Sequence, residues 1–280
     1  GKRSAMHVLP PEPDLRTCGG SLLDQMPTKP GQTSDQVGYE QLCTRWNREE
    51  AEAVQKSKRT LQSELTSKEA KMRAINELEY WAIRRGGYDA EIVLIGTLTS
   101  PDKELAGAAH ISLKKTWANH FNVWVNNQMG HANVLLRAGE TEESLSIFDK
   151  VIFENPLWGE GYHLRAKCWN QMKDVNRTIS DLQSALEFCP NNYIVMVELG
   201  VTLMDKKGDL EGAAKLFQSA EFLCPFLPIS VFTDSLYKKA PHLRPAHVEA
   251  GSEDAFSPER LPSRLMPERW IERVEATERP

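Results

Sequence analysis

The seven histidines are the first residues to consider for acid–base or metal chemistry, and they lie far apart in the sequence. A zinc site or a catalytic base needs a second ligand, or a carboxylate that orients the ring, at a spacing that the fold brings together. We find no histidine–cysteine or histidine–carboxylate pair at such a spacing. The histidines are His7, His110, His120, His131, His163, His242 and His247. We therefore predict that each is a solvated or packed side chain.

The acidic residues Asp205, Asp209 and Glu211 are close enough in sequence to suggest a calcium site. They lack the glycine and the terminal bidentate glutamate of a helix–loop–helix calcium site, so a solvated turn is favoured. The five cysteines form no C-x-x-C pair, and the chain has no glycine-rich phosphate loop, G-x-S-x-G elbow or H-E-x-x-H motif. The sequence predicts no catalytic residue, no metal site and no cofactor, and indicates that the protein is not an enzyme.

The strongest regularity is a repeat that closes at Pro156, Pro190 and Pro225, which are 34 and 35 residues apart. Small residues recur at positions 8, 20 and 27 of a common frame, and a large apolar residue recurs at position 24. The third segment carries one extra residue, in its polar turn at 205–209. The frames begin at Val125, Gly159 and Tyr193; position 8 is Ala132, Ala166 and Gly200, position 20 is Ser144, Thr178 and Ala213, position 24 is Phe148, Leu182 and Phe217, and position 27 is Val151, Ala185 and Ala220.

This pattern resembles the tetratricopeptide repeat (TPR), a helix–turn–helix unit of about 34 residues. The resemblance covers roughly residues 122–226. It implies an all-α fold, a TPR-like α-solenoid of about three repeats. The rest of the chain adds a long N-terminal helix, capping helices and extended proline-rich termini.

The second repeat carries a more particular motif, Glu-Gly-Tyr-His-Leu-Arg-Ala at 160–166 followed by Ser-Asp-Leu at 180–182. It resembles a subgroup of small TPR proteins of bacteria and plastid-bearing eukaryotes, whose first helix reads close to Glu-Gly-Trp-Asn-x-Arg-Ala. This subgroup has no assigned chemistry, so the resemblance supports ancestry more than activity.

Outside the repeats, composition divides the chain into four further parts. We predict one long helix or two over 36–84, because the segment lacks proline and has a narrow apolar stripe. Ser100 is expected to cap a second helical stretch, with Pro101 in its first turn. The predicted parts are an extended N-terminal arm at 1–35, a helical region and cap at 36–121, the repeats at 122–226, a capping helix at 227–240 and an extended tail at 241–280.

The stripe of Leu105, Ala109, Leu113 and Trp117 is expected to lie against the first helix of the first repeat. That position would make 101–121 a cap or half of a degraded fourth repeat. At the other end, 229–240 is expected to cover the apolar edge that a last repeat otherwise exposes.

The resemblance implies a concave groove lined by positions 2, 5, 9 and 12 of each first helix. In the third repeat these positions are wholly apolar, and each such side chain left in water forfeits about 1.5–3 kcal/mol. We therefore expect a bound segment to cover them. The predicted groove residues are Asn126, Met129, Asn133 and Leu136, then Glu160, His163, Lys167 and Asn170, then Ile194, Val197, Val201 and Met204.

The best-known ligand of the family is the acidic C-terminus of cytosolic heat-shock chaperones, held by a clamp of lysine, asparagine and arginine. Only Asn133 matches the clamp. Met129, Leu164, Ile194 and Glu198 stand where the other clamp residues would be. A carboxylate would meet Glu198 with no cation to offset it, so this ligand is not predicted.

The favoured function is a non-catalytic interaction or scaffold subunit, an accessory component of a larger organellar complex. Its groove would hold an apolar segment, either from its own tail or from a partner protein. The tail carries large apolar residues that could act as anchors, among them Phe256, Leu265 and Trp270. A segment of this kind gains its ordering energy from binding.

Two alternatives stay open. An RNA-binding helical repeat could read bases with Asn126, Asn133 and Lys167, although the net charge of −5 and the apolar third repeat oppose this. An enzyme could have a site between 36–121 and the repeats, but no residue there is nominated.

Location follows only from general features. No apolar run approaches the ~20 residues needed to cross a bilayer, and the sequence pI is about 5.9. The chain starts at Gly1, and its first 35 residues are rich in proline, glycine, serine and threonine. This suggests a chloroplast or mitochondrial protein after removal of a transit peptide, with a truncated chain or a cytosolic location as the alternative.

Overall fold

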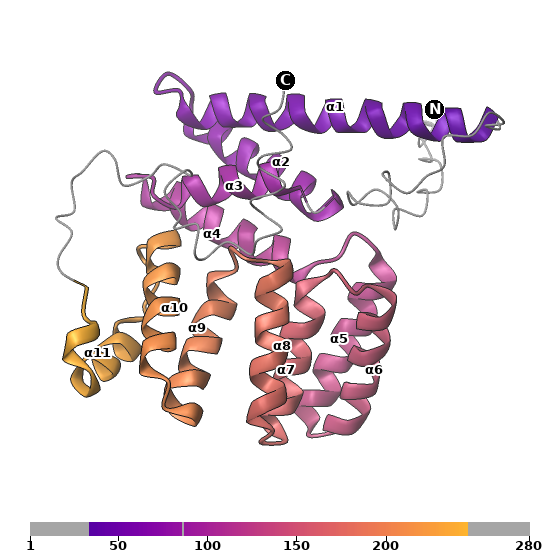
Figure 1. Cartoon of the computed structure of the whole chain (residues 1–280). Helices are drawn as coiled ribbons and strands as arrows, with labels where there is room; N and C mark the ends of the chain where they lie inside the picture. Colours follow the sequence, from indigo (N-terminus) through magenta and orange to yellow (C-terminus); the bar gives the residue numbers. More distant parts are fainter. Residues whose placement is uncertain (1–33, 86, 246–280) are drawn as a thin grey trace. The chain divides into compact units, whose positions relative to one another are not determined.

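The computed structural model describes residues 34–85 and 87–245, with side chains described from residue 47 onward except at residue 85. All regular structure in these residues is helical, which confirms the all-α class (Figure 1). The helices form two compact units that divide between Val93 and Leu94. The predicted tail anchors Phe256, Leu265 and Trp270 lie outside the described residues, as does most of the predicted N-terminal arm.

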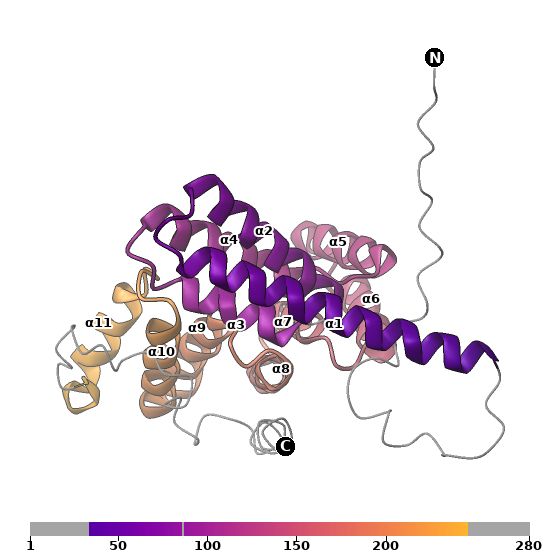
Figure 2. The same ribbon diagram turned by 90° about the horizontal axis from the view of Figure 1, so that it is seen from above.

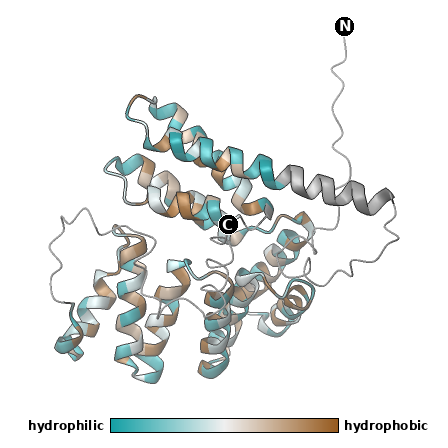
Figure 3. Cartoon of the chain, turned by 45° about the horizontal axis from the view of Figure 1, so that its top comes forward, coloured by the Kyte–Doolittle hydropathy of each residue, from teal (hydrophilic) through white to brown (hydrophobic). Residues whose placement is uncertain are grey.

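The N-terminal unit is built on two packed helices, α1 (Ser34–Gln62) and α2 (Lys68–Arg85). The sequence left one helix or two open for this stretch. The break falls at 63–67, where the Ser67 hydroxyl accepts a hydrogen bond from the Ala70 amide and starts α2. Ile75 and Leu78 are fully buried, whereas the described side chains of α1 are mostly hydrophilic (Figure 3). Helix α3 (Tyr88–Thr97) then crosses the boundary between the units.

Helix α4 (Lys103–Ala118) begins two residues later than the sequence suggested, and its cap is a different residue. The Asp102 side chain accepts hydrogen bonds from the amides of Glu104 and Leu105, so Asp102 is the N-cap. The Ser100 hydroxyl bonds the amide of Asp102 and fixes the preceding turn instead. The prediction of Ser100 as cap is therefore wrong, because a carboxylate two residues on satisfies more of the free amides at the helix start.

Three helical hairpins follow and lie side by side (Figures 1 and 2). The first helices of the hairpins form one row and the second helices form the other (Figure 2). All twelve repeat positions named from the sequence are buried, which confirms the frame. The hairpins are α5 (Val123–Ala138) with α6 (Thr141–Glu154), α7 (Gly159–Gln171) with α8 (Val175–Phe188), and α9 (Tyr193–Thr202) with α10 (Leu210–Leu223).

The turns inside the hairpins also repeat. Gly139, Lys173 and Gly208 occupy the same place in successive turns and all have positive φ, at 89°, 63° and 71°. The extra residue of the third repeat is absorbed just before this point, in a π-helical turn η3 (Leu203–Lys207) that continues α9. The sequence suggested that the insertion lengthens the solvated turn at 205–209. Instead, the insertion widens the end of a helix.

A short helix closes the C-terminal end of the array. Helix α11 (Ser230–Lys239) and the turn η4 (Pro241–Leu243) follow α10. Ile229 and Leu236 are buried in one cluster with Phe217 of α10. This is the contact that the sequence pattern of 229–240 predicts.

Helix α4 does not take the predicted place against α5. Within its unit it contacts α7, and His110 and Trp117 lie against the ring of Tyr193 at the start of α9. The residues of the predicted stripe are buried, but in a helix that contacts α7 and the first residue of α9. The repeat array therefore starts at α5 without α4 as a stacked neighbour.

Candidate functional site

The predicted groove contains a closed network of charged side chains centred on His163 of α7. His163 is only 5% exposed. Its Nδ1 lies 2.8 Å from Glu160 Oε2, one helical turn earlier, and its Nε2 lies 3.0 Å from Glu198 Oε2 on α9. Lys167 Nζ lies 3.7 Å from the other oxygen of Glu198. The network links the first helices of the second and third repeats, contrary to the expectation of an unpartnered histidine.

This geometry favours the protonated imidazole. Burial by itself would lower the pKa of His163, but the hydrogen bonds and charges of Glu160 and Glu198 outweigh it and raise the pKa to about 9. Burial also disfavours the charged form of Glu198 and by itself would raise the pKa of that carboxyl. The contacts with His163 and Lys167 outweigh burial and bring the pKa below the ordinary value. Two cations then balance two carboxylates. With both ring nitrogens donating to carboxylates, His163 has no free lone pair to act as a base.

Asn126, at position 2 of the first repeat, is also used internally. Its Nδ2 donates to the carbonyl oxygen of His120 at 2.7 Å, and its Oδ1 accepts from the amide of His120 at 2.8 Å. The side chain therefore holds the connection between α4 and α5. Reading a nucleic-acid base would require breaking both bonds.

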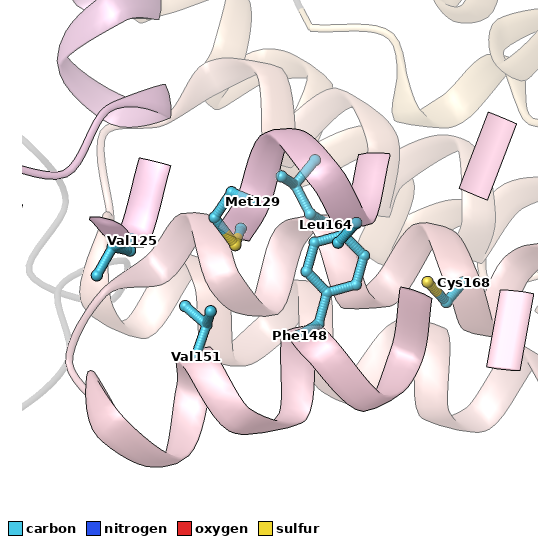
Figure 4. Close-up of a cluster of buried hydrophobic side chains, with 7 residues drawn as sticks. Val125, Met129, Phe148, Val151, Leu164 and Cys168 are labelled. Atoms are coloured by element: carbon cyan, nitrogen blue, oxygen red, sulfur yellow. The ribbon is translucent and has the colours of Figure 1, made fainter. Parts of the chain in front are cut away.

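Two predicted groove residues belong to the core instead. Met129 is 4% exposed and lies with Val125, Phe148 and Leu164 in the cluster between the first two repeats (Figure 4). Met204 is 6% exposed and packs with α10 and α11. Their prediction as groove-lining residues is wrong: the flexible Met129 side chain fills the gap beside α7, and the π-helical turn directs Met204 inward.

The remaining predicted residues are more accessible. Ile194, Val197 and Val201 are half-buried along α9, and the last two pack at the edge of the third-repeat cluster. Leu136 is half-buried against the first cluster. Asn133 is half-buried and Asn170 is exposed. Their role in binding a partner stays a prediction, and the apolar surface of the third repeat is smaller than the sequence suggested.

The motif of the second repeat has a structural explanation. Arg165 donates from Nε and Nη2 to the two oxygens of Asp181, at 2.8 and 2.7 Å, and from Nη1 to Asp149 at 2.7 Å. Trp169 Nε1 donates to Asp181 at 3.0 Å. The pKa of Arg165 is raised above its ordinary value, mainly by the hydrogen bonds with Asp181. The motif residues Arg165 and Asp181, together with Asp149, therefore join α6, α7 and α8.

Sequence reasoning missed one further contact at the edge of the groove. His110 Nδ1 of α4 lies 2.7 Å from the hydroxyl oxygen of Tyr193, 83 positions later in the chain. Burial lowers the pKa of His110, and the charge of Lys114 lowers it further. Burial raises the pKa of Tyr193, which is fully buried. These directions fit a neutral imidazole that accepts a hydrogen bond from the tyrosine hydroxyl.

Comparisons with known proteins add little. No protein-family model matches the chain, and no curated protein matches it. Among solved structures, one titled "MamA RS-1 ArsTM double mutant" is 19% identical, with 66% of this chain and 97% of that chain covered. Its TM-score of 0.34 is too low to carry an argument. The class of protein is therefore defined by the fold itself, an all-α solenoid of helical hairpins, and the TPR family remains a resemblance.

The described residues show neither a metal site nor a membrane span. No group of three or more histidine, cysteine, aspartate or glutamate side chains among them is arranged to hold a metal ion. No helix in that part of the chain combines the length and the apolar character needed to cross a bilayer.

Proposed function

We propose that this protein is a non-catalytic scaffold that binds an apolar segment of a protein partner in the groove of its helical repeats. The groove is the face formed by α5, α7 and α9. The protein would act as an accessory subunit of a larger assembly in a chloroplast or mitochondrion.

The observation that carries this proposal is the contrast between the polar and apolar parts of the groove. The charged groups at its centre neutralise one another, because Lys167 and His163 face Glu198 and Glu160. Beside them, Ile194, Val197 and Val201 are half-buried, so part of each apolar side chain stays accessible. A surface with satisfied charges and partly accessible apolar side chains suits an apolar ligand better than a carboxylate or a phosphate.

The same contacts count against nucleic acid as the ligand. Of the three residues that could read bases, Asn126 is bonded at both ends of its amide and Lys167 faces Glu198. Asn133 alone is a weak basis for recognition. Counterion release from phosphates needs several free cations along a surface, and the chain has a net charge of −5.

The test compares two valines in the full-length chain, Val197 in the groove and Val231 on α11, which is 73% exposed. Tagged wild type, Val197→Lys and Val231→Lys are isolated from native cells, and bound proteins are quantified by mass spectrometry. We expect Val197→Lys to lose about tenfold of a partner that wild type retains in constant ratio, and Val231→Lys to keep it. Circular dichroism verifies that both variants are folded. Equal retention by the two variants would refute groove binding.

The assembly and its location need separate measurements. Native fractionation should place the protein in the organelle fraction, at a mass well above 31.7 kDa. A monomer in the cytosolic fraction would contradict this part of the proposal while leaving groove binding untouched.

A further inference from the structure

The outer face of α5 is exposed at the beginning of the repeat array, and it carries no charge between Val123 and Val134. Val123 is 69% exposed and Val134 is 63% exposed, while Val125 on the opposite side is buried. Gly130 lies between the two exposed valines, and a methyl group added there would meet nothing within 4 Å. A neighbouring helix could therefore approach α5 closely at Gly130.

The corresponding face of α7, in the second repeat, packs against the preceding hairpin. Gly161, Leu164 and Cys168 stand at positions 3, 6 and 10 of the second repeat and are all buried. Leu164 lies in the cluster with Phe148 of α6. Cys168 Sγ lies 3.5 Å from the hydroxyl oxygen of Ser144, which is also on α6. These positions thus receive the second helix of the preceding hairpin.

On α5 the corresponding positions are Asn127, Gly130 and Val134, and all three are exposed. Helix α4, which precedes α5 in the chain, contacts α7 and Tyr193 instead. The first repeat therefore has a stacking position for a preceding helix that no described residue of its own unit, 94–245, occupies. Solenoids need a cap at such an end because the stacking face is otherwise left in water.

We propose that residues 267–279 of the same chain pack on the outer face of α5 as this missing helix. The segment lies outside the described residues, and its sequence has the required pattern. Trp270, Ile271 and Val274 fall on one side of a helical period, and Pro267 stands at a first-turn position. This proposal concerns a different surface from the groove and does not depend on its occupant.

The length of the tail permits this contact within one molecule. The described chain ends at Pro245, close to Leu243, whose carbonyl oxygen accepts a hydrogen bond from Gln218 of α10 at 3.3 Å. Residues 246–266 can span about 70 Å when extended. The path from α10 to α5 crosses about five helix-to-helix steps of ~10 Å each. The tail is therefore long enough to return to the start of the array.

The charges of the tail segment fit this position in one orientation. Helix α5 contains no acidic residue, and its only ionisable side chains are His131 and Arg137. The tail segment has glutamates at 268, 272, 275 and 278 and arginines at 269, 273 and 279. On a helical period Glu268, Glu272 and Glu275 lie on one flank of the apolar side, and Arg269 and Arg273 lie on the other flank. With the apolar side packed on Val123 and Val134, the helix would be favoured in the orientation that turns the acidic flank toward Arg137 and the basic flank away from it.

The experiment places the photo-crosslinker p-benzoylphenylalanine at Val134 in the full-length chain, with the same probe at Val231 as control. Both sites are exposed, so neither probe disturbs the core. We expect crosslinks from position 134 to residues 266–276 at monomer mass, and none of these from position 231. Crosslinks to the same residues at dimer mass would show that a second copy supplies the tail. Crosslinks to another protein or to other residues, or no crosslink, would equally overturn the proposal.

A matched pair of tail variants sharpens the result. Trp270→Ala should lower the yield of the crosslink at least about fivefold, as loss of a buried aromatic anchor does. Phe256→Ala, in the same tail but outside the segment, should leave the yield unchanged. Val197→Lys in the groove should also leave it unchanged, which separates this inference from the proposed function. Equal yields in Trp270→Ala and Phe256→Ala would show that the contact is non-specific.

Discussion

The two junctions between successive repeats are stabilised by different kinds of buried contact. Between the first and second repeats, apolar residues of α5, α6 and α7 form one buried cluster. Between the second and third repeats, the apolar cluster of Ala166, Val195 and Leu199 is joined by the charged network around His163. The first junction also has the ion pair of Arg165 with Asp149, but the side chain of Asp149 is 53% exposed and the buried contacts are apolar. We therefore expect the stability of the first junction to depend less on protonation than that of the second.

The difference shows where the array can tolerate change. An apolar junction loses stability in proportion to the volume removed, whatever the pH. A junction made by a buried charge depends on every partner being present, because a missing partner leaves another charge unpaired in a partly desolvated place. The predictions below test this contrast, starting with the largest effect.

Phe148→Ala should lower the free energy of unfolding by about 3–5 kcal/mol, because the ring is fully buried in the first junction and its loss leaves a cavity. Urea unfolding followed by circular dichroism measures the change. Phe153→Ala is the matched control: this ring is 86% exposed near the end of the same helix. It should change stability by no more than about 0.5 kcal/mol. Similar losses in both variants would show that Phe148 is not the centre of the junction.

His163→Leu should cost about 2–3 kcal/mol, less than a fully buried ion pair, because Glu198 keeps partial contact with water. The leucine retains apolar volume but leaves Glu160 and Glu198 without the cation between them. The triple variant that adds Glu160→Gln and Glu198→Gln should recover most of the loss. If the triple variant is no more stable than His163→Leu, the network does not stabilise the junction through charge.

The pH dependence of stability separates the two junctions most directly. The pKa of His163 is raised from 6.5 to about 9 in the folded chain, so its stabilising effect is complete below pH 6.5 and is lost as the pH rises toward 9. Wild type and Phe148→Ala should both lose on the order of 1–2 kcal/mol between pH 7 and 9 from this source. His163→Leu should lack that part of the decline. A profile for His163→Leu parallel to that of wild type would contradict the assignment.

The repeat core could be predicted from the sequence because its determinants are local and periodic. Small residues such as Ala132 and large ones such as Phe148 recur with the repeat, and burial of both follows directly. The capping contact of Ile229 and Leu236 was accessible for the same reason. Helical periodicity specifies which residues share a face, and stacking of hairpins decides which face is inside.

The candidate site was harder to predict because periodicity does not say what lies opposite a face. The side chains at position 5 of each repeat were expected to be exposed to solvent. Met129 and His163 are buried there and Val197 is half-buried. The reason is that this position points toward the adjacent first helix. A signal for the His163 network did exist. Glu160 is one turn before His163, and Glu198 follows it by 35 residues, about one repeat period.

The placement of α4 could not be derived from its stripe. Leu105, Ala109 and Leu113 predict a buried face correctly, but the partner is decided by a connection of four residues between α4 and α5. In that connection His120 is held by Asn126, and its ring lies 5.1 Å from that of Trp158. Such contacts between distant segments have no local sequence pattern.

The smallest predicted effect concerns the glycine at position 8 of the third repeat. A methyl group at Gly200 would lie 2.7 Å from the ring of Phe217, whereas the first two repeats have alanine at this position. Gly200→Ala should be destabilising by about 1 kcal/mol, because overpacking costs ~1–3 kcal/mol and the helical preference of alanine returns up to ~1 kcal/mol.

Gly107→Ala in α4 is the matched control, since a methyl group there meets nothing within 4 Å. It should be stabilising by about 0.5–1 kcal/mol, so the two glycine variants should differ in sign. The double variant Gly200→Ala with Phe217→Leu should recover part of the loss by removing the ring that the methyl group meets, beyond what the two single changes predict together. Strict additivity would mean that the ring of Phe217 moves aside freely, and that the third repeat is packed less tightly against position 8 than the first junction is around Phe148.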